Sequence, residues 1–165
     1  MTPRSLPLPI PLLLGLAIAC GPSSTVDEGT GVVQELDTSE TGITTFVREG
    51  RYKGWLAEAA VHETRAPHGS KVRVFFNDTV VQSLRAGNAT HPVGSILVKE
   101  LYEGDGKTLR GHALDVKISE GSGKDTWIFY EGFGPDYSSN YYGRGHSTCH
   151  GCNASGRDYV TSTLP

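Results

Sequence analysis

The stretch SILVKELY, residues 95–102, carries the strand pattern that decides the fold class of this chain. Successive side chains of a strand point to opposite faces, so Lys99 shares one face with the two leucines of the stretch. The other face carries Ile96 and Val98 together with Glu100. Both faces are therefore partly apolar, and we expect residues 95–102 to form a strand of a sheet.

Three more stretches around it have the composition of strands. Residues 71–76 read KVRVFF, and their β-branched and aromatic side chains favour a strand. Residues 109–119 and 126–131 are further strand candidates. The segments GDG and GSG separate these stretches and are typical of hairpin connections. Strands joined in this way predict an antiparallel sheet.

Two helices are expected beside these strands. Apolar side chains recur at helical spacing within residues 51–63, which predicts a helix there. Asn77 and Asp78 can cap a second, short helix over residues 79–85, which Gly87 would end. The order of elements predicts an α+β domain: a small antiparallel β-sheet of about four to five strands with one or two helices packed on it.

The last part of the chain, residues 132–165, is rich in glycine, and we expect it to be a long irregular segment. Long irregular segments in compact domains are usually functional or disordered. This one holds two of the three cysteines of the chain, Cys149 and Cys152.

The composition limits the class of protein. A length of 165 residues is about one domain, and a hydrophobic fraction of 37% is enough for a core. The 15 basic and 18 acidic side chains leave a net charge of −3, so the chain has no field that would attract nucleic acid. The 21 glycines and 9 prolines do not suit a helical bundle. With only three cysteines the chain is not a disulfide scaffold.

The N-terminal residues 1–19 have the pattern of an export signal. Arg4 precedes an apolar run that is too short to cross a bilayer as a helix. The run ends in AIAC, and this sequence resembles the lipobox of bacterial lipoproteins, which implies that Cys20 is diacylated and becomes the new N-terminus. The alternative is a cleaved secretory signal in which Cys20 has no role. Either interpretation places the mature chain outside the cytoplasm. The lipobox predicts a lipid-anchored protein of the bacterial cell envelope, periplasmic or surface-exposed.

Residues 20–45 are expected to form a flexible acidic tether behind Cys20. Beyond Cys20 the segment is rich in Ser, Thr, Gly and acidic residues, and it contains no Lys or Arg. The folded domain would then occupy residues 46–165, attached to a membrane through the lipid on Cys20.

Chemistry is concentrated around the C-x-x-C motif of Cys149 and Cys152. Two cysteines at this spacing can attach a c-type haem, bind a soft metal or close a small disulfide. Attachment of haem c needs an axial histidine directly after the second cysteine, and Asn153 stands there. The spacing of the cysteines alone decides nothing, but the motif with Asn153 would by itself exclude haem attachment.

A series of segments in the folded part matches one known family in order and rough spacing. The most specific segment is GSILVKEL at residues 94–101, with its glycine, strand, lysine and glutamate. The other matching segments are YKGW at 52–55, VRVFFND at 72–78, WIFY at 127–130, the C-x-x-C motif, Asp158 and Val160. Together these segments resemble the cytochrome P-460 family, and the resemblance covers nearly all of the folded part.

The resemblance implies a small periplasmic protein that carries haem c and either oxidises hydroxylamine or binds and processes nitric oxide, with an electron-transfer partner. Cys149 and Cys152 would attach the haem. Lys99 would stand where hydroxylamine-oxidising members join a lysine to the porphyrin. Arg73 would lie near the haem pocket, and Asp115 is the only candidate for the family's distal carboxylate.

The sequence departs from the family at Asn153, which occupies the position of the axial histidine. Three function classes therefore remain. The first, which the resemblance favours and which we expect, is a haem protein in which His146 or His150 would have to reach the iron. The second is a haem-free binding or structural lipoprotein with a disulfide between Cys149 and Cys152. The third is a small zinc or copper site built from these two histidines and two cysteines.

Lys99 and Arg73 also have ordinary explanations. Lys99 lies between two leucines on its face, where partial burial would lower its pKa, but lysines often extend from a sheet to water instead. Arg73 shares a face with Phe75 and can be a solvated side chain of an exposed strand face.

Overall fold

The computed structural model describes residues 32–33, 36–64 and 71–165. Cys20, the expected signal and most of the expected tether lie outside these residues. Within the described part, no helix has both the length and the apolar character that a membrane span requires.

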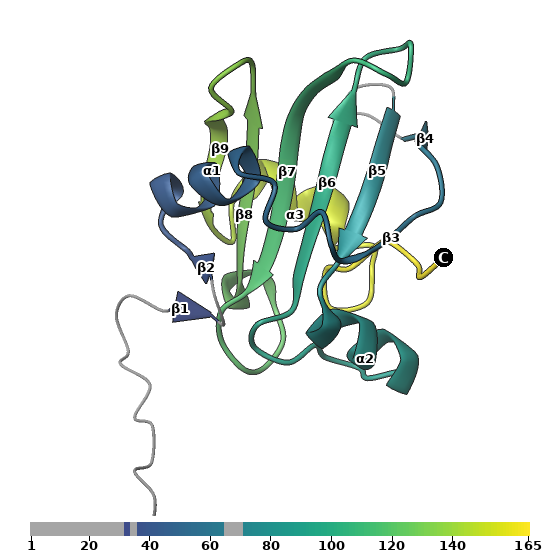
Figure 1. The fold of residues 1–165 in the computed structure, drawn as a ribbon. Coiled ribbons are helices and arrows are strands. Elements are labelled where there is room, and N and C mark those ends of the chain that lie inside the picture. Colours follow the sequence, from purple (N-terminus) through teal and green to yellow (C-terminus); the bar gives the residue numbers. More distant parts are fainter. Residues whose placement is uncertain (1–31, 34–35, 65–70) are drawn as a thin grey trace, which may run out of the picture.

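A seven-stranded antiparallel sheet forms the centre of the domain (Figure 1). Five strands follow one another along the chain and across the sheet: β5 (Lys71–Phe76), β6 (Ile96–Tyr102), β7 (Leu109–Lys117), β8 (Trp127–Phe133) and β9 (Ser138–Arg144). Two short strands, β3 (Leu56–Ala57) and β4 (His62–Glu63), pair with β5 at the opposite edge from β9. A separate two-stranded pair is formed by β1 (Val32–Val33) and β2 (Leu36–Asp37).

Three α-helices and one short 3-10 helix accompany the sheet: α1 (Glu40–Arg48), α2 (Asp78–Ala86), η1 (Lys124–Thr126) and α3 (Ser147–Asn153). The expected cap of α2 is present, because the Asn77 side chain accepts a hydrogen bond from the Val80 amide. Gly87 ends α2 in the left-handed conformation with φ 70°. The α+β class is confirmed, while the described strands and helices outnumber the prediction.

The helix predicted over residues 51–63 is wrong. This segment forms turns followed by β3 and β4. Its apolar side chains do not form one buried stripe, since Tyr52 is fully buried whereas Leu56 is 37% exposed. The helix in this part of the chain is α1, which begins at Glu40 after the cap residue Ser39.

The packed part of the chain begins earlier than expected. Residues 20–45 were predicted to be a tether, but α1 starts inside that segment, and Leu36 and Ile43 are buried in the core. The irregular segment expected over residues 132–165 is also wrong in part, because it contains β9 and α3. Strand β9 is ordered by tertiary packing that short-range pattern does not reveal, whereas α1 carries a local signal in its cap residue Ser39 and its apolar stripe.

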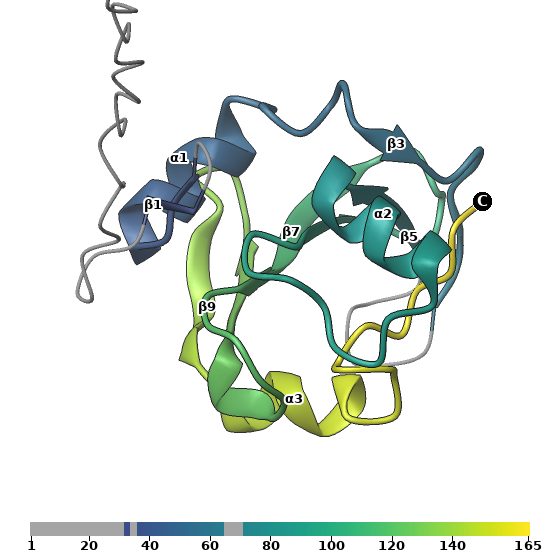
Figure 2. The same cartoon turned by 90° about the horizontal axis from the view of Figure 1, so that it is seen from below.

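The two faces of the sheet carry separate cores. One face packs against α1 and includes Ile96, Val98 and Leu114. The opposite face includes Leu97 and Trp127 and packs against α2 and the C-terminal segment. Figures 1 and 2 show α1 and α3 on opposite sides of the sheet, and we call these sides the α1 face and the α3 face.

Candidate functional site

A buried group of polar side chains lies between the sheet and α3. The Lys99 ammonium donates a hydrogen bond to Asp115 Oδ2 at 2.9 Å. It also lies 3.5 Å from the amide oxygen of Asn153, which comes from α3. All three residues are buried. We define the Lys99 cluster as these three residues together with Glu131 and Cys149.

The strand register brings the sheet members of the cluster together. Lys99 on β6 pairs with Ala113 on β7, and Ala113 pairs with Glu131 on β8. Paired residues of neighbouring strands point to the same face, and so does Asp115, which lies two residues after Ala113. The antiparallel meander therefore places an ammonium and two carboxylates on the α3 face.

Helix α3 contributes a thiol and an amide to the same place. Cys149 and Asn153 are four residues apart and lie on one side of the helix. Cys149 is half-buried and packs against the core of the α3 face. Burial, together with the negative charges of Asp115 and Glu131 and against the opposing effect of Lys99, raises the pKa of the Cys149 thiol to about 12. The thiol is therefore protonated at neutral pH.

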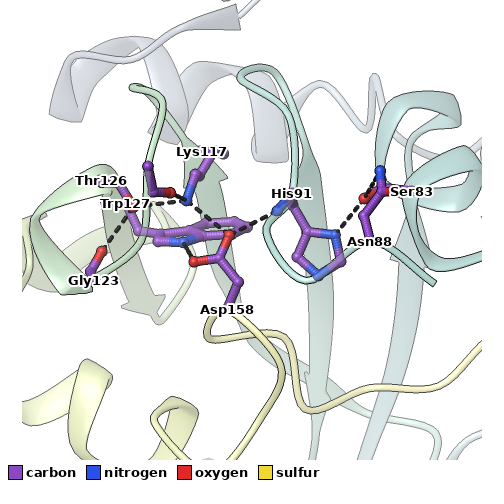
Figure 3. Close-up of polar contacts among 9 residues, drawn as sticks. Ser83, Asn88, His91, Lys117, Gly123, Thr126, Trp127 and Asp158 are labelled. Carbon is purple, nitrogen blue, oxygen red and sulfur yellow. Dashed lines mark hydrogen bonds and ion pairs between the residues drawn. The ribbon is translucent and has the colours of Figure 1, made fainter. Parts of the chain in front are cut away.

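Helix α3 is held at its C-terminal side by a second buried network (Figure 3). Asp158, five residues beyond the end of the helix, accepts hydrogen bonds from the Lys117 ammonium and from the His91 amide, both at 2.8 Å. The Trp127 indole nitrogen lies 3.5 Å from the other oxygen of Asp158. These contacts fasten the segment after α3 to the sheet. The sequence did not predict them, because no local pattern connects Asp158 with Lys117 and only the family resemblance pointed to Asp158.

Arg73 does not join the Lys99 cluster. Its neighbour Val74 pairs with Lys99, so the Arg73 side chain lies on the α1 face. There its Nε donates to the backbone oxygen of Glu58 at 2.8 Å, and its guanidinium lies 5.2 Å from the centre of the Phe75 ring. Arg73 is partly buried on a packed face, so it is not the solvated side chain of an exposed strand face that the ordinary explanation described.

The α1 face has a polar cluster of its own that the sequence did not reveal. The Tyr52 hydroxyl lies 2.7 Å from Glu100 Oε1 and 2.8 Å from His112 Nε2. Burial lowers the pKa of His112 to about 4, so the ring is neutral at neutral pH. Residues 52 and 112 are far apart in the chain, and only the packing of the segment after α1 against β6 and β7 brings them together.

The two histidines of the C-x-x-C region lie outside the Lys99 cluster. His146 Nδ1 is 3.8 Å from Cys149 Sγ, and its ring packs against Tyr141. His150 is partly exposed on α3, and Cys152 is exposed. Both cysteines are free thiols. Within residues 32–33, 36–64 and 71–165, no group of three or more His, Cys, Asp or Glu side chains is arranged to hold a metal ion, so the geometry gives no support to the small metal site.

The residues of the cluster do not fit the iron of a c-type haem. The position directly after Cys152 faces inward, as an axial ligand would, but it carries the amide of Asn153. That amide oxygen already faces the Lys99 ammonium. An amide side chain does not supply the ligand field of an imidazole.

Comparisons with known proteins add no identification. No family model matches the chain. No curated protein matches its sequence. The resemblance to the cytochrome P-460 family therefore rests on the quoted segments.

Proposed function

We propose that this chain is an exported, lipid-anchored domain of the cytochrome P-460 type that works without haem, as a binding domain for a small polar ligand at the Lys99 cluster. One observation carries the proposal. Asn153 occupies the position of the axial histidine, and its amide is turned onto Lys99 instead of leaving a nitrogen ligand for iron.

The free-energy cost of burying the charged side chains of the Lys99 cluster supports a binding role. Burying an ammonium and two carboxylates opposes folding unless the charges are fully paired and hydrogen-bonded. Lys99 makes one short hydrogen bond, to Asp115, and one long contact, to Asn153. A titratable group with a strongly shifted pKa, such as the Cys149 thiol beside this pair, often marks a functional site. The Lys99 ammonium would offer a donor, and the Asp115 carboxylate an acceptor, to a small ligand with polar groups of both kinds.

The cellular placement rests on Cys20 and the segment before it. A diacyl group on Cys20 would attach the domain to a membrane, and the net charge of −3 disfavours nucleic acid as a partner. The test is detergent partitioning of the exported protein. Cys20→Ser should move the protein from the detergent phase to the soluble fraction of the envelope. A wild-type protein that is fully soluble and begins after Cys20 would remove the anchor from the proposal.

The absence of haem is tested by expression in a bacterium with an active cytochrome c maturation system. We expect a colourless wild-type protein, with no covalent haem after denaturing electrophoresis. Asn153→His is the matched variant, because it restores the C-x-x-C-H motif at an inward-facing position. Covalent haem in the wild-type protein at one per chain would overturn the proposal. Haem in the variant alone would show that only the residue at position 153 excludes the cofactor.

The second candidate is a haem protein that oxidises hydroxylamine or binds nitric oxide, as the resemblance implies. One observation favours it: Lys99, Asp115 and Cys149, to which the resemblance assigns roles at one site, lie together on the α3 face. Pigmented wild-type protein in the experiment above would select this candidate.

A further inference from the structure

The two thiols of the C-x-x-C motif have different surroundings. Cys152 is exposed, whereas Cys149 is half-buried against the core of the α3 face. Both belong to α3, and both are free. A solvent-accessible thiol beside a protected one is the arrangement in which one sulfur meets an external disulfide and the other attacks afterwards.

Their spacing is compatible with a disulfide. Residues three positions apart in an α-helix have Cα atoms about 5 Å apart, from the rise and radius of the helix. That separation lies within the range in which a disulfide forms without large backbone movement. The two thiols are also close enough for the charge of Cys152 to act on Cys149.

We propose that Cys149 and Cys152 form a thiol–disulfide exchange site, in which Cys152 attacks external disulfides and Cys149 resolves the mixed disulfide. The inference rests on the proposed function to the extent that neither sulfur is bonded to haem. The substrate class is a low-molecular-weight or protein disulfide, as occurs in an oxidising compartment.

The reaction balances as two exchanges. The Cys152 thiol loses its proton to solvent, and the thiolate attacks a disulfide RS–SR, forming a Cys152–SR bond and releasing one thiolate, RS⁻. Cys149 then loses its proton, attacks Cys152 Sγ and displaces the second RS⁻. The two cysteines are oxidised to one disulfide, the external disulfide is reduced to two thiols, and the released thiolates take up the two protons.

The surroundings of Cys149 fit the slower, second role. Its sulfur packs against apolar core side chains, and the neighbouring Asp115 and Glu131 disfavour a negative charge there. His146 Nδ1, 3.8 Å from Cys149 Sγ, is placed to accept the proton when Cys149 attacks. Cys152 has no such shielding, because its residue is exposed.

The experiment uses the full chain with Cys20→Ser, in which Cys149 and Cys152 are the only cysteines. The reduced protein is mixed with oxidised glutathione and followed by intact mass. The parent should lose two hydrogens per chain and release two reduced glutathiones. The added change Cys149→Ala should leave a stable glutathione adduct on Cys152. The matched variant Cys152→Ala should form its adduct at least roughly tenfold more slowly, because its remaining thiol is half-buried.

Equal adduct rates in the two variants would overturn the assignment of roles, and a parent that keeps glutathione without closing a disulfide would overturn the exchange site. Circular dichroism of each variant before mixing checks that the fold is retained. The proposed function fails separately, by covalent haem in the wild-type chain. A colourless protein with unreactive thiols would therefore disprove this inference alone.

Discussion

Two buried lysine–aspartate pairs lie on the α3 face, and they differ in how completely they are bonded. The pair of Lys117 and Asp158 has an N–O distance of 2.8 Å, and that of Lys99 and Asp115 has 2.9 Å. The distances alone would assign them the same role. Their surroundings separate them.

Lys117 is the fully satisfied member of the comparison. Its side chain has no exposure, and its ammonium donates to the backbone oxygen of Gly121. Figure 3 shows its two other acceptors, Thr126 and Asp158. Asp158 also accepts a hydrogen bond from the backbone amide of His91. A buried charge with all its hydrogen bonds made stabilises one conformation, so we assign this network a structural role: it fastens the C-terminal segment to the sheet.

The Lys99 ammonium makes fewer good hydrogen bonds than that of Lys117, and a thiol lies near it. It makes one short hydrogen bond and one contact at 3.5 Å, and the Cys149 thiol lies within its electrostatic reach. The distance within the ion pair therefore does not distinguish the pair with a structural role from the pair with the proposed binding role. The two pairs differ in the number and quality of the other hydrogen bonds that the lysine makes.

The largest effect is expected from Asp158→Ala, which leaves the Lys117 charge buried without a counter-ion. We expect a loss of about 3–5 kcal/mol in the free energy of unfolding, measured by urea denaturation. The control is Asp125→Ala, because Asp125 pairs with Lys124 on the surface at 2.7 Å. That variant should lose less than about 1 kcal/mol. Similar losses in both variants would contradict the structural role of the network.

The next largest effect is a contrast between two double replacements. Lys99→Met with Asp115→Leu removes both charges of the cluster pair, and replacing a buried pair by apolar residues is often neutral or stabilising. We expect a change of less than about 1 kcal/mol. Lys117→Met with Asp158→Leu should lower the free energy of unfolding by more. The Thr126 hydroxyl and the His91 amide each lose a hydrogen-bond partner, and each such loss costs about 1–3 kcal/mol. Equal costs in the two denaturation curves would end the distinction between the pairs.

A smaller effect is expected on the loss of stability at acidic pH. Burial lowers the pKa of His91 below its ordinary value of 6.5, against the raising effect of the Asp158 charge. As pH falls below 6.5, His91 takes up a proton more readily in the unfolded state than in the folded state. The free energy of unfolding is therefore not reduced by His91 above that pH and falls below it. His91→Gln should flatten the loss of unfolding free energy between neutral and acidic pH.

The Lys99 cluster offers the control for this acid effect, since no histidine of the described residues is hydrogen-bonded to Lys99. Lys99→Met with Asp115→Leu removes both charges of that pair and no histidine, so it should leave the loss of unfolding free energy just below pH 6.5 as it is in the wild-type protein. His112 on the α1 face, with its pKa lowered to about 4, supplies the slope that remains in His91→Gln. An acid curve unchanged by His91→Gln would show that His91 does not carry the effect.

The smallest effect is a shift in the acidity of Cys149. Asp115→Asn removes a negative charge that raises the Cys149 pKa, so the thiol should become more acidic by less than about one pKa unit. The measurement is the pH dependence of alkylation in a Cys20→Ser, Cys152→Ala background. Asp125→Asn is the distant control and should leave the profile unchanged. A Cys149 pKa that rises in Asp115→Asn would contradict the geometry of the cluster.

The local sequence predicted part of this architecture well. Residues 71–76, 95–102 and 109–119 were expected as strands and contain β5, β6 and β7, and the expected strand over 126–131 covers all but the last two residues of β8. The cap and stop of α2 were also expected. These features depend on neighbours within a few residues, through alternation, capping side chains and glycine turns, so the sequence alone determines them.

The remaining features depend on contacts between distant residues. Strand β9 is weak in local pattern and is ordered because it pairs with β8. Helix α1 has local signals, the cap residue Ser39 and the buried Ile43, Phe46 and Val47 at helical spacing, but the Ser, Thr and acidic content of its segment predicted a tether instead. The sequence could pair Lys99 with the leucines of its own strand, but its contact with Asn153 spans 54 positions. The sequence determined which residue follows Cys152 and therefore that imidazole is missing there. Only the tertiary structure decided that the asparagine in that place faces a buried ammonium, because register between strands and the docking of α3 set which side chains meet.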